Sequence, residues 1–366
     1  MSETDRLLES SIEDGAFPGA SYAIWKNGEL IQGATGHHTY DEDSPNVTLE
    51  TVWDLASLSK VIGTTTAAMI LVQERLLDLD QPVCSVIPEF GIHQKNKITF
   101  RNLMVHDSGL VAFRRYHENC TTASEVMNSF YKEELSYETG TDTIYSDLSM
   151  ILVSEAIERV TGQRLDGFLK QRVFEPLGMM RSGFFRQAES TFISKVSRIE
   201  CAPTETVEPW RTKMRLQRYG SDDSKKLFGK DPIYIQGEVH DPTATVLDGV
   251  AGHAGLFSTI GDLSNYLIQF MLGTQRIVGQ EVWDLFTNRQ DVKSTRALGW
   301  DTKSPKGSSA GRTFGEKSFG HTGYTGTSIW CDPEGMKFAI LLTNRVHPTS
   351  ENQKIIAVRP QFHSFC

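Results

Sequence analysis

The chain has 366 residues, of which 39% are hydrophobic, 10% aromatic and 23% charged. These proportions are typical of a globular protein and exclude a disordered or fibrous chain. The formal net charge of −9 disfavours nucleic acids and anionic membrane surfaces as partners.

The first residues, MSETDRLLESSIED, carry acids where a secretory signal would carry basic residues, and no apolar run follows them. No later stretch is apolar over the length that a bilayer requires. We therefore expect a cytoplasmic protein without a membrane-spanning segment. The five cysteines are scattered and form no Cys-x-x-Cys pair, which argues against a disulfide framework and against a zinc ribbon.

Two β-hairpins are predicted, one near each end of the chain. Asn27 and Gly28 separate two runs of strand-forming residues, and this dipeptide is a strong signal for a two-residue turn. Residues 332–335 separate two further runs, of which the second contains FAILLT. A strand that is apolar at nearly every position is typically buried on both faces. We expect both hairpins to join one antiparallel sheet built from the two ends of the chain.

Between the hairpins the apolar residues recur with a helical period. The predicted helices cover residues 59–80, residues 147–161 with Gly162 as the cap, residues 260–273 and part of residues 286–292. Residues 200–231 are polar and partly basic, which favours a surface excursion. The expected fold class is α+β: a terminal antiparallel sheet flanked by helices, with a mainly helical lobe inserted into it.

The stretch WDLASLSK contains a serine, Ser57, three residues before a lysine, Lys60. Positions i and i+3 of a helix lie on one face, so the two side chains can meet. At a helix N-terminus the serine hydroxyl also lies at the positive end of the helix dipole. Because burial lowers the pKa of a lysine, a neutral Lys60 could accept the proton of Ser57. The alternative is an ordinary serine at the start of a helix.

The spacing alone does not decide between these interpretations, because Ser129 and Lys132 show it as well. Lys132 has polar neighbours, and its match predicts no site. Lys60 stands among apolar residues and is expected to point into the interior, where a lysine without a partner is costly. This difference favours the catalytic interpretation for Ser57.

Two more short motifs follow in chain order. Tyr145-Ser146-Asp147 directly precedes a predicted helix, and His321-Thr322-Gly323 directly precedes the last hairpin. With these three motifs the chain resembles the superfamily of serine β-lactamases and penicillin-binding proteins, specifically its class C-like branch, which includes family VIII esterases and D-aminopeptidases. The stretches FPGASYAI, ITFRNLMVHDSGL and GVAGHAGLFSTIGDL add to the resemblance.

The resemblance implies a β-lactamase/transpeptidase-like fold with its active site between two lobes. We place the sheet lobe at residues 1–85 and 290–366, and the helical lobe at residues 86–289. The resemblance makes Ser57 the nucleophile that becomes acylated, and Lys60 its proton acceptor or relay. Tyr145 would protonate the leaving group and activate the water for deacylation. Which of Lys60 and Tyr145 is the base in each step stays open.

The resemblance also implies an oxyanion hole formed by the backbone N–H groups of Ser57 and Tyr324. Thr322 and Gly323 would contact the substrate at the edge of the sheet. A side chain at position 323 would crowd that substrate, and this would explain why the residue is a glycine.

Two other histidines have open roles. His253 lies in a glycine-rich loop that the resemblance places beside the active site, where it contacts the substrate, supports Tyr145 or bonds only to the backbone. His106 and Asp107 could mimic the His/Asp pair of a hydrolase. Adjacent residues do not face each other on a helix or turn, so we expect a structural role for this pair.

Two positions depart from the pattern of the family. Asp147 stands where β-lactamases and transpeptidases usually have asparagine, and His321 stands where they usually have lysine. An ionised aspartate only accepts hydrogen bonds, and a histidine is charged only in part near neutral pH. Both changes weaken recognition of a substrate carboxylate, so the sequence favours less anionic substrates.

The sequence therefore predicts a serine hydrolase, an esterase or amidase, that works through an acyl-enzyme on a small ester, amide or peptide. No cofactor or metal is expected. A D-alanine peptidase or a weak β-lactamase is the alternative among hydrolases. A penicillin-recognising sensor that is acylated and never turns over is the alternative outside enzymes, and Tyr145 argues against it because a sensor needs no deacylation.

Overall fold

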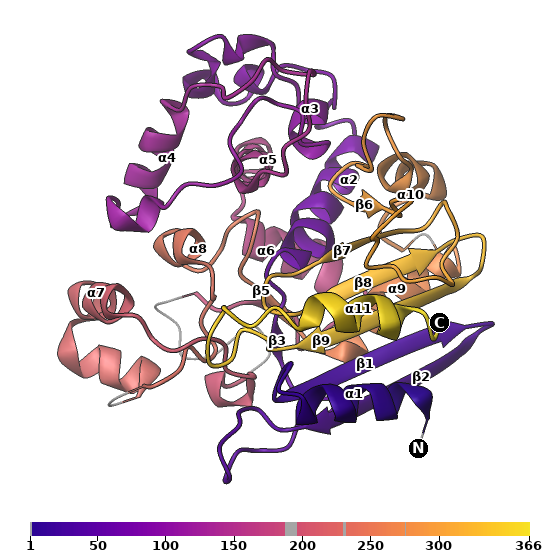
Figure 1. The fold of residues 1–366 in the computed structure, drawn as a ribbon. Coiled ribbons are helices and arrows are strands. Elements are labelled where there is room, and N and C mark those ends of the chain that lie inside the picture. The colour runs from indigo at the N-terminus through magenta and orange to yellow at the C-terminus, as the bar shows by residue number, and fades with distance from the viewer. Residues whose placement is uncertain (1, 187–195, 230–231, 275) are drawn as a thin grey trace.

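The computed structural model describes residues 2–186, 196–229, 232–274 and 276–366. Strands from both ends of the chain form one six-stranded antiparallel sheet in the order β2-β1-β9-β8-β7-β6 (Figure 1). The strands are β1 (Gly19–Lys26), β2 (Glu29–Gly36), β6 (Asp301–Thr302), β7 (Phe319–Thr322), β8 (Ser328–Asp332) and β9 (Lys337–Thr343). The predicted α+β class and the sheet built from the two termini are confirmed.

Both predicted hairpins are present. β1 pairs with β2 across Asn27 and Gly28, and both turn residues have positive φ. Asparagine and glycine adopt this left-handed geometry more readily than other residues. β9 is buried at every position and lies between β1 and β8, as expected for the FAILLT strand.

Helices cover both faces of the sheet (Figure 1). α1 (Glu3–Glu13) and α11 (Ile355–His363) pack against each other on one face, and α9 (Ile260–Met271) contacts β1 and β9 on the other. Successive residues of β1 point to opposite faces. Tyr22 therefore packs with α1 and α11, whereas Trp25 stacks on Phe338 in the main core, with ring centroids 5.7 Å apart.

The remaining helices and a small second sheet build the rest of the molecule. The helices are α2 (Thr66–Gln73), α3 (Phe100–Met104), α4 (Ala123–Tyr131), α5 (Asp147–Thr161), α6 (Leu165–Leu169), α7 (Pro209–Phe228), α8 (Pro242–Val246) and α10 (Gln280–Thr287). β3 (Trp53–Asp54), β5 (Leu256–Ser258) and β4 (Gly183–Phe184) form the second sheet in that order. α5 ends at Gly162, whose φ of 68° confirms the predicted cap.

Two helical predictions need correction. The helix expected for residues 59–80 begins with a π-helical segment, Lys60–Thr65, and its continuation α2 ends at Gln73. Arg75 has a φ of 58°, which no right-handed helix accommodates. α10 ends at Thr287, so most of residues 286–292 are not helical.

Of residues 200–231, those that the structure describes, 200–229, are more than a surface excursion. They contain α7, which begins with Pro209 as a helix start allows. Arg211 and Arg215 of this helix are buried and form ion pairs with the buried Glu238. The polar composition of the segment therefore includes charges that lie inside the protein.

The division into lobes at residues 85 and 289 stays a proposal, and α9 from the middle of the chain packs on the sheet. All five cysteines are free. Within the described ranges, no helix combines the length and the apolar character needed to cross a membrane.

The stacked pair in the core gives a stability prediction. Phe338→Ala removes a fully buried ring and should lower the free energy of unfolding by about 3–5 kcal/mol, measured by urea denaturation. Ile31→Ala, at a position of the edge strand β2 that is 58% exposed, should change it by less than about 0.5 kcal/mol. Similar losses in the two variants would be inconsistent with this assignment of the core.

Candidate active site

Ser57 lies in a tight turn between β3 and the π-helical segment. The residue before it, Ala56, has a φ of 47°, which is uncommon for a residue with a side chain. The buried carboxylate of Asp54 accepts a hydrogen bond from the Ala56 N–H at 2.8 Å. The carbonyl of Asp54 accepts another from the Thr325 hydroxyl at 2.7 Å. The turn that presents Ser57 is thus fixed to the loop after β7.

Gly323 is required by this contact between the two segments. A Cβ atom at position 323 would lie 2.1 Å from Thr327 Oγ1 and 2.5 Å from the carbonyl oxygen of Leu55. The expectation that a side chain here would crowd the substrate stays a prediction, and the structure adds a reason within the protein itself. The side chain would first collide with the turn that carries the serine.

Lys60 is fully buried, and its side-chain nitrogen reaches three acceptors. Nζ lies 2.9 Å from Ser57 Oγ, 2.8 Å from Asp147 Oδ1 and 3.0 Å from the carbonyl oxygen of His253. Three acceptors match the three N–H groups of an ammonium ion. The first and second predicted motifs are thereby brought together by direct contact.

The carboxylate of Asp147 changes the charge expected for Lys60. Burial by itself lowers the pKa of this lysine, but the attraction of Asp147, with a contribution from Tyr145, outweighs it and raises the pKa to about 12. The expectation of a neutral Lys60 in the resting site is therefore wrong. Asp147, which we expected to contact the substrate, pairs with the lysine, and no signal in the sequence indicated this contact.

Tyr145 is enclosed by cations and imidazole rings. Its ring centroid lies 4.9 Å from Lys60 Nζ and 5.0 Å from Arg296 Cζ. The centroid of the His106 ring lies 4.8 Å away, and that of the His321 ring 5.6 Å away. The hydroxyl is buried and has no hydrogen-bond partner among the described residues. Burial raises the pKa of Tyr145, although Lys60 acts in the opposite direction. A protonated phenol is therefore available in the site.

His106 holds the segment that carries this tyrosine. The histidine is fully buried, and its Nδ1 atom accepts a hydrogen bond from the Ser146 N–H at 3.1 Å. Burial, together with the positive charge of Arg296, keeps the pKa of His106 well below its usual range, so Nδ1 stays an acceptor. The predicted structural role is confirmed. Nothing in the sequence indicated that His106 acts on the residue after Tyr145.

His321 is also uncharged. It is buried in β7, and burial together with the nearby charges of Arg296 and Lys60 lowers its pKa to about 3. Its Nδ1 atom lies 2.9 Å from the carbonyl oxygen of Thr322. His321 therefore does not replace the positive charge of the lysine that the family usually has at this position.

Two backbone N–H groups face no acceptor. Within the described ranges, neither Ser57 nor Tyr324 donates its backbone N–H to a hydrogen bond. Arg359 donates to the carbonyl oxygen of Gly323 at 2.6 Å, and Arg345 donates to that of Tyr324 at 2.7 Å. The C=O and N–H of a trans peptide point in opposite directions. Arg359 thus fixes the direction of the Tyr324 N–H as well.

A cleft of about 460 Å³ opens beside Ser57. Its lining includes Tyr145, the residues 321–324, Asp301 and three arginines, Arg296, Arg345 and Arg359. The guanidinium of Arg296 contacts the Tyr145 ring and forms no hydrogen bond within the described part of the chain. Burial lowers the pKa of Arg359 to about 10, which still leaves it positive at neutral pH, and its Nε atom is buried without a partner there.

These arginines were missed by the sequence analysis because no motif contains them. Arg296 lies 25 positions before His321 and Arg359 lies 38 positions after it, so only the fold brings them to one cleft. Their charge removes the reason to expect less anionic substrates. The cleft is positive although His321 is neutral.

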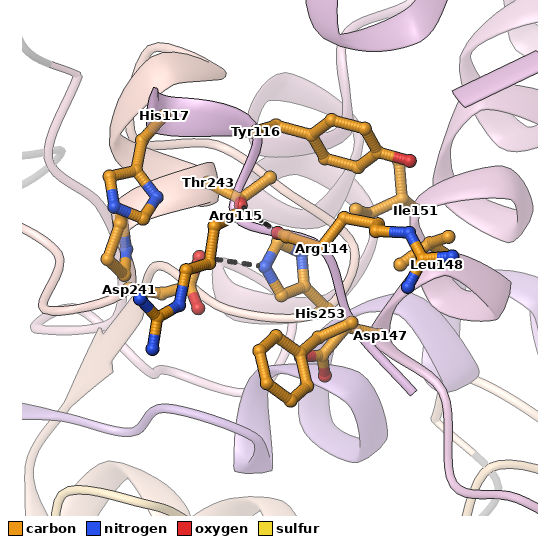
Figure 2. Close-up of a pocket in the computed structure, with 12 residues that line it drawn as sticks. Arg114, Arg115, Tyr116, His117, Asp147, Leu148, Ile151, Asp241, Thr243 and His253 are labelled. Carbon is orange, nitrogen blue, oxygen red and sulfur yellow. Dashed lines mark hydrogen bonds and ion pairs between the residues drawn. The ribbon is translucent and has the colours of Figure 1, made fainter. Parts of the chain in front are cut away.

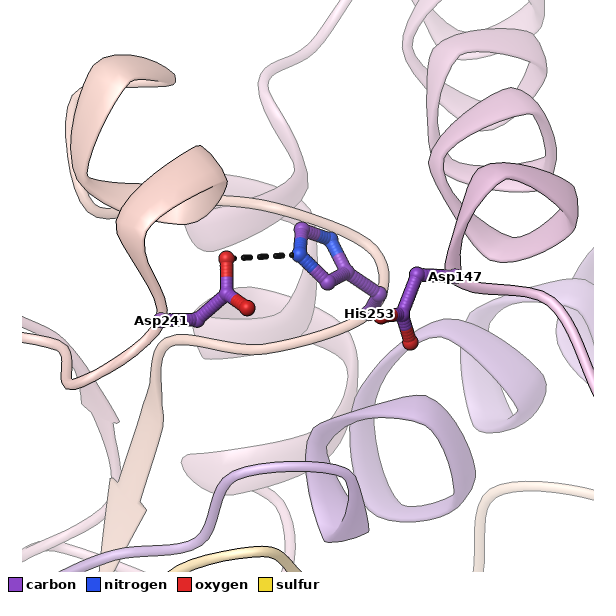
Figure 3. A group of neighbouring side chains, drawn as sticks. All are labelled: Asp147, Asp241 and His253. Atoms are coloured by element: carbon purple, nitrogen blue, oxygen red, sulfur yellow. Dashed lines mark hydrogen bonds and ion pairs between the residues drawn. The ribbon is translucent and has the colours of Figure 1, made fainter. Parts of the chain in front are cut away.

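A second cavity, of about 180 Å³, has Asp147 in its lining (Figure 2). Asp147, Asp241 and His253 converge on it, with one side-chain atom of each lying within 4.8 Å of the others (Figure 3). His253 Nε2 lies 2.9 Å from Asp241 Oδ1. His253 does not bond only to the backbone, because its ring bonds to the side chain of Asp241, and its carbonyl oxygen accepts from Lys60. Contact of His253 with the substrate and its support of Tyr145 stay predictions.

The fold and these groups define a serine hydrolase with a lysine and a tyrosine beside the serine. The chain belongs to the Beta-lactamase family, whose model matches residues 4–361. This agrees with the resemblance that the three motifs indicate.

Individual relatives differ in the reaction that their names give. The chain is 31% identical to the N-acetylmuramyl-L-alanine amidase of Bacillus subtilis, over 95% of this chain and 81% of the relative. It is 27% identical to a putative D-alanyl-D-alanine carboxypeptidase of Escherichia coli, over 97% of this chain and 84% of the relative. Among solved structures, the hydrolase EstCE1 superposes with a TM-score of 0.74 at 18% sequence identity, and the match covers 99% of this chain and 97% of EstCE1. A class C β-lactamase superposes with a TM-score of 0.73 at 18% identity, and the match covers 99% of this chain and 97% of the β-lactamase.

The pairing of Lys60 with Asp147 predicts a changed pH dependence on substitution. In Asp147→Asn, the contribution of Tyr145 still opposes the effect of burial on Lys60, but that of Asp147 is lost, so the pKa of the lysine falls from its raised value of about 12. At pH 7 kcat/KM should drop by at least about tenfold, because the substituted site lacks a carboxylate to receive a proton. The variant should regain activity as pH rises and Lys60 loses its proton, whereas the wild-type profile stays flat from neutral to mildly alkaline pH.

Asp284→Asn, on the exposed side of α10, is the matched control and should keep the wild-type profile. An Asp147→Asn profile parallel to that of the wild type would show that the carboxylate does not set the charge of Lys60.

Proposed function

We propose that this protein hydrolyses amides through an acyl-enzyme on Ser57. Its substrate carries a carboxylate on the leaving-group side. Esters with the same charge pattern would also be substrates. The observation that carries the proposal is the positive cleft beside the serine, in which three arginines face a single carboxylate, Asp301.

Acylation begins with a proton relay through Lys60. Its ammonium passes a proton to Asp147 as it receives the hydroxyl proton of Ser57, and Ser57 Oγ attacks the carbonyl carbon. The contacts of 2.9 Å and 2.8 Å on the two sides of Nζ support this path. Lys60 keeps its charge throughout, and Asp147 is the group that ends with the proton.

The negative charge of the tetrahedral intermediate needs donors at fixed positions. We assign this role to the N–H groups of Ser57 and Tyr324, which lack acceptors in the described part of the chain. The carbonyl of Gly323, held by Arg359, supports the orientation of the second donor.

Tyr145 serves the leaving group and the deacylating water. Its buried phenol is protonated, so it can give a proton to the departing nitrogen or oxygen. The resulting phenolate is stabilised by Lys60 and Arg296, which both lie over its ring. The phenolate then takes a proton from the water that attacks the acyl-enzyme. As the acyl group leaves Ser57, Lys60 gives a proton to Ser57 Oγ and takes back the proton held by Asp147, so the site returns to its resting state.

Arg296 is the residue to which we assign the substrate carboxylate. Its guanidinium lies beside Tyr145, where the leaving group departs, and has no hydrogen-bond partner in the described part of the chain. Arg345 is engaged by carbonyl groups of residues 324, 350 and 352. Arg359 adds positive charge next to it.

The names of the relatives agree with this charge pattern. The Bacillus subtilis relative is named for an amide bond to alanine, and the Escherichia coli relative for a bond to a terminal D-alanine. A simple esterase is the second candidate, since His321 is neutral and EstCE1 shares the fold.

The test is a pair of matched substrates. Acetyl-Lys-D-Ala-D-Ala and N-acetylmuramyl-L-alanine are each offered as the free acid and as the C-terminal amide, and kcat/KM is measured for all four. For at least one pair, kcat/KM of the free acid should exceed kcat/KM of the amide by about tenfold or more, which corresponds to the loss of one charge-assisted hydrogen bond. Arg296→Gln should reduce that ratio to near one, while Arg296→Lys keeps part of it.

Arg276→Gln removes an exposed arginine outside the cleft and should leave the ratio unchanged. Ser57→Ala should abolish turnover and labelling by a fluorophosphonate. Turnover of p-nitrophenyl esters without any turnover of these amides would favour the esterase candidate. Equal rates for acids and amides would refute the role of Arg296.

A further inference from the structure

The buried carboxylate of Asp54 holds two segments of the chain at once. Its Oδ1 atom accepts a hydrogen bond from the Ala56 N–H at 2.8 Å, in the turn that presents Ser57. Its Oδ2 atom accepts another from the His240 N–H at 2.7 Å. The backbone directly before Asp241 is therefore tied to the turn of the nucleophile.

The side chain of Asp241 is fixed on the other side of this bond. Its Oδ1 atom accepts from the Ala244 N–H at 2.7 Å, so Asp241 is the N-cap of α8. The same oxygen lies 2.9 Å from His253 Nε2. Burial by itself would raise the pKa of Asp241, but the interaction with His253, together with the Ala244 N–H and the charge of Lys60, holds the pKa below its usual range. The carboxylate is therefore ionised and accepts a hydrogen bond from the imidazole ring.

The ring of His253 is held by this carboxylate (Figure 3). The histidine is 2% exposed, and its Nδ1 atom is buried without a hydrogen-bond partner in the described part of the chain. As far as the described residues go, the hydrogen bond that orients the ring is the one to Asp241.

The carbonyl group of His253 accepts from Lys60 Nζ at 3.0 Å. The preceding carbonyl, that of Gly252, accepts from Thr64 Oγ1 at 2.7 Å. Gly252 also packs so closely on α5 that a Cβ atom there would lie 2.1 Å from the carbonyl oxygen of Met150. Because the ring and the carbonyl of His253 are attached to the same Cα atom, a fixed ring restricts the backbone rotation that would turn the carbonyl away from Lys60.

The ammonium group of Lys60 depends on this third acceptor. Its three N–H groups diverge from one nitrogen, so a bond to the His253 carbonyl directs the other two. These two reach Ser57 Oγ and Asp147 Oδ1. Without a fixed third acceptor, rotation about the last bonds of the lysine side chain moves Nζ out of the path between them. A misplacement of about 1 Å can slow a catalysed step by about a hundredfold.

We propose that Asp241 is a positioning residue for the lysine of the active site. Through the ring of His253 it fixes the carbonyl oxygen that holds Lys60. The proposal rests on the assignment of Ser57 as the acylated residue. Asp241 itself transfers no proton, and its contribution is a hydrogen-bond acceptor in a fixed place.

The test measures the second-order rate constant for labelling of Ser57 by a fluorophosphonate at pH 7. In this reaction Ser57 Oγ bonds to phosphorus, fluoride leaves and the hydroxyl proton enters the relay of Lys60, so the natural substrate is not needed. Asp241→Ala should lower the rate constant by about tenfold or more. Asp241→Asn should stay within about threefold of the wild type, because its amide oxygen still accepts from His253 Nε2 and from the Ala244 N–H.

A double variant shows whether Asp241 acts through His253. His253→Phe keeps the backbone carbonyl and a ring of similar size but loses the hydrogen bond, and it should slow labelling about as much as Asp241→Ala. Residues that act as one unit have non-additive effects. The double variant should therefore label no more slowly than His253→Phe alone, and fully additive losses would contradict the positioning role.

Thr122→Ala is the matched control, since it removes the N-cap of α4 as Asp241→Ala removes that of α8, and it should keep the wild-type rate constant. Labelling of Asp241→Ala at the wild-type rate overturns the proposal. So does an equal loss in Asp241→Asn, because the charge and not the hydrogen bond would then matter.

If Asp241→Ala does not fold, His253→Phe decides, and labelling of this variant at the wild-type rate overturns the proposal as well. A wild-type protein that is not labelled at Ser57 would refute the proposed function, and with it this role of Asp241.

Discussion

The site depends on one buried ammonium group, that of Lys60, and on the three acceptors around it. Serine, aspartate and a backbone carbonyl from three distant parts of the chain meet at this nitrogen. A lysine that is fully buried without such partners would be strongly destabilising. The ion pair with Asp147 makes the burial tolerable, and it also fixes the lysine as a proton carrier that starts in its charged form.

The fold supplies these groups from its rigid parts. Ser57 sits in a turn braced by Asp54 and by the loop after β7, and Asp147 is the first residue of α5, where a negative charge is favourable. The edge of the terminal sheet brings Tyr324 to the same place. The cleft beside the Lys60–Asp147 pair is lined by three arginines, Arg296, Arg345 and Arg359.

The sequence predicted the sheet, the hairpins, α5 and the three motifs, because each leaves a local signal: a turn dipeptide, an apolar period, a short spacing. It could not predict the charge of Lys60, since this depends on the Asp147 carboxylate, which the fold brings to the lysine from 87 positions away. The same holds for Arg296, Arg359 and Asp241, which belong to no motif and meet the site only through tertiary contacts. Gly323 was identified correctly as a required glycine, but its neighbours in space were not.

The pairing of Lys60 with Asp147 is tested most directly by the protonation state of Lys60. In protein with 13Cε- and 15Nζ-labelled lysine, the Lys60 signal is identified by its loss in Lys60→Arg and is then followed with pH. We expect an ammonium signal that persists through the alkaline range, in line with a pKa of about 12. A signal that titrates near neutral pH would contradict it, because Lys60 would then be a neutral base in the resting site.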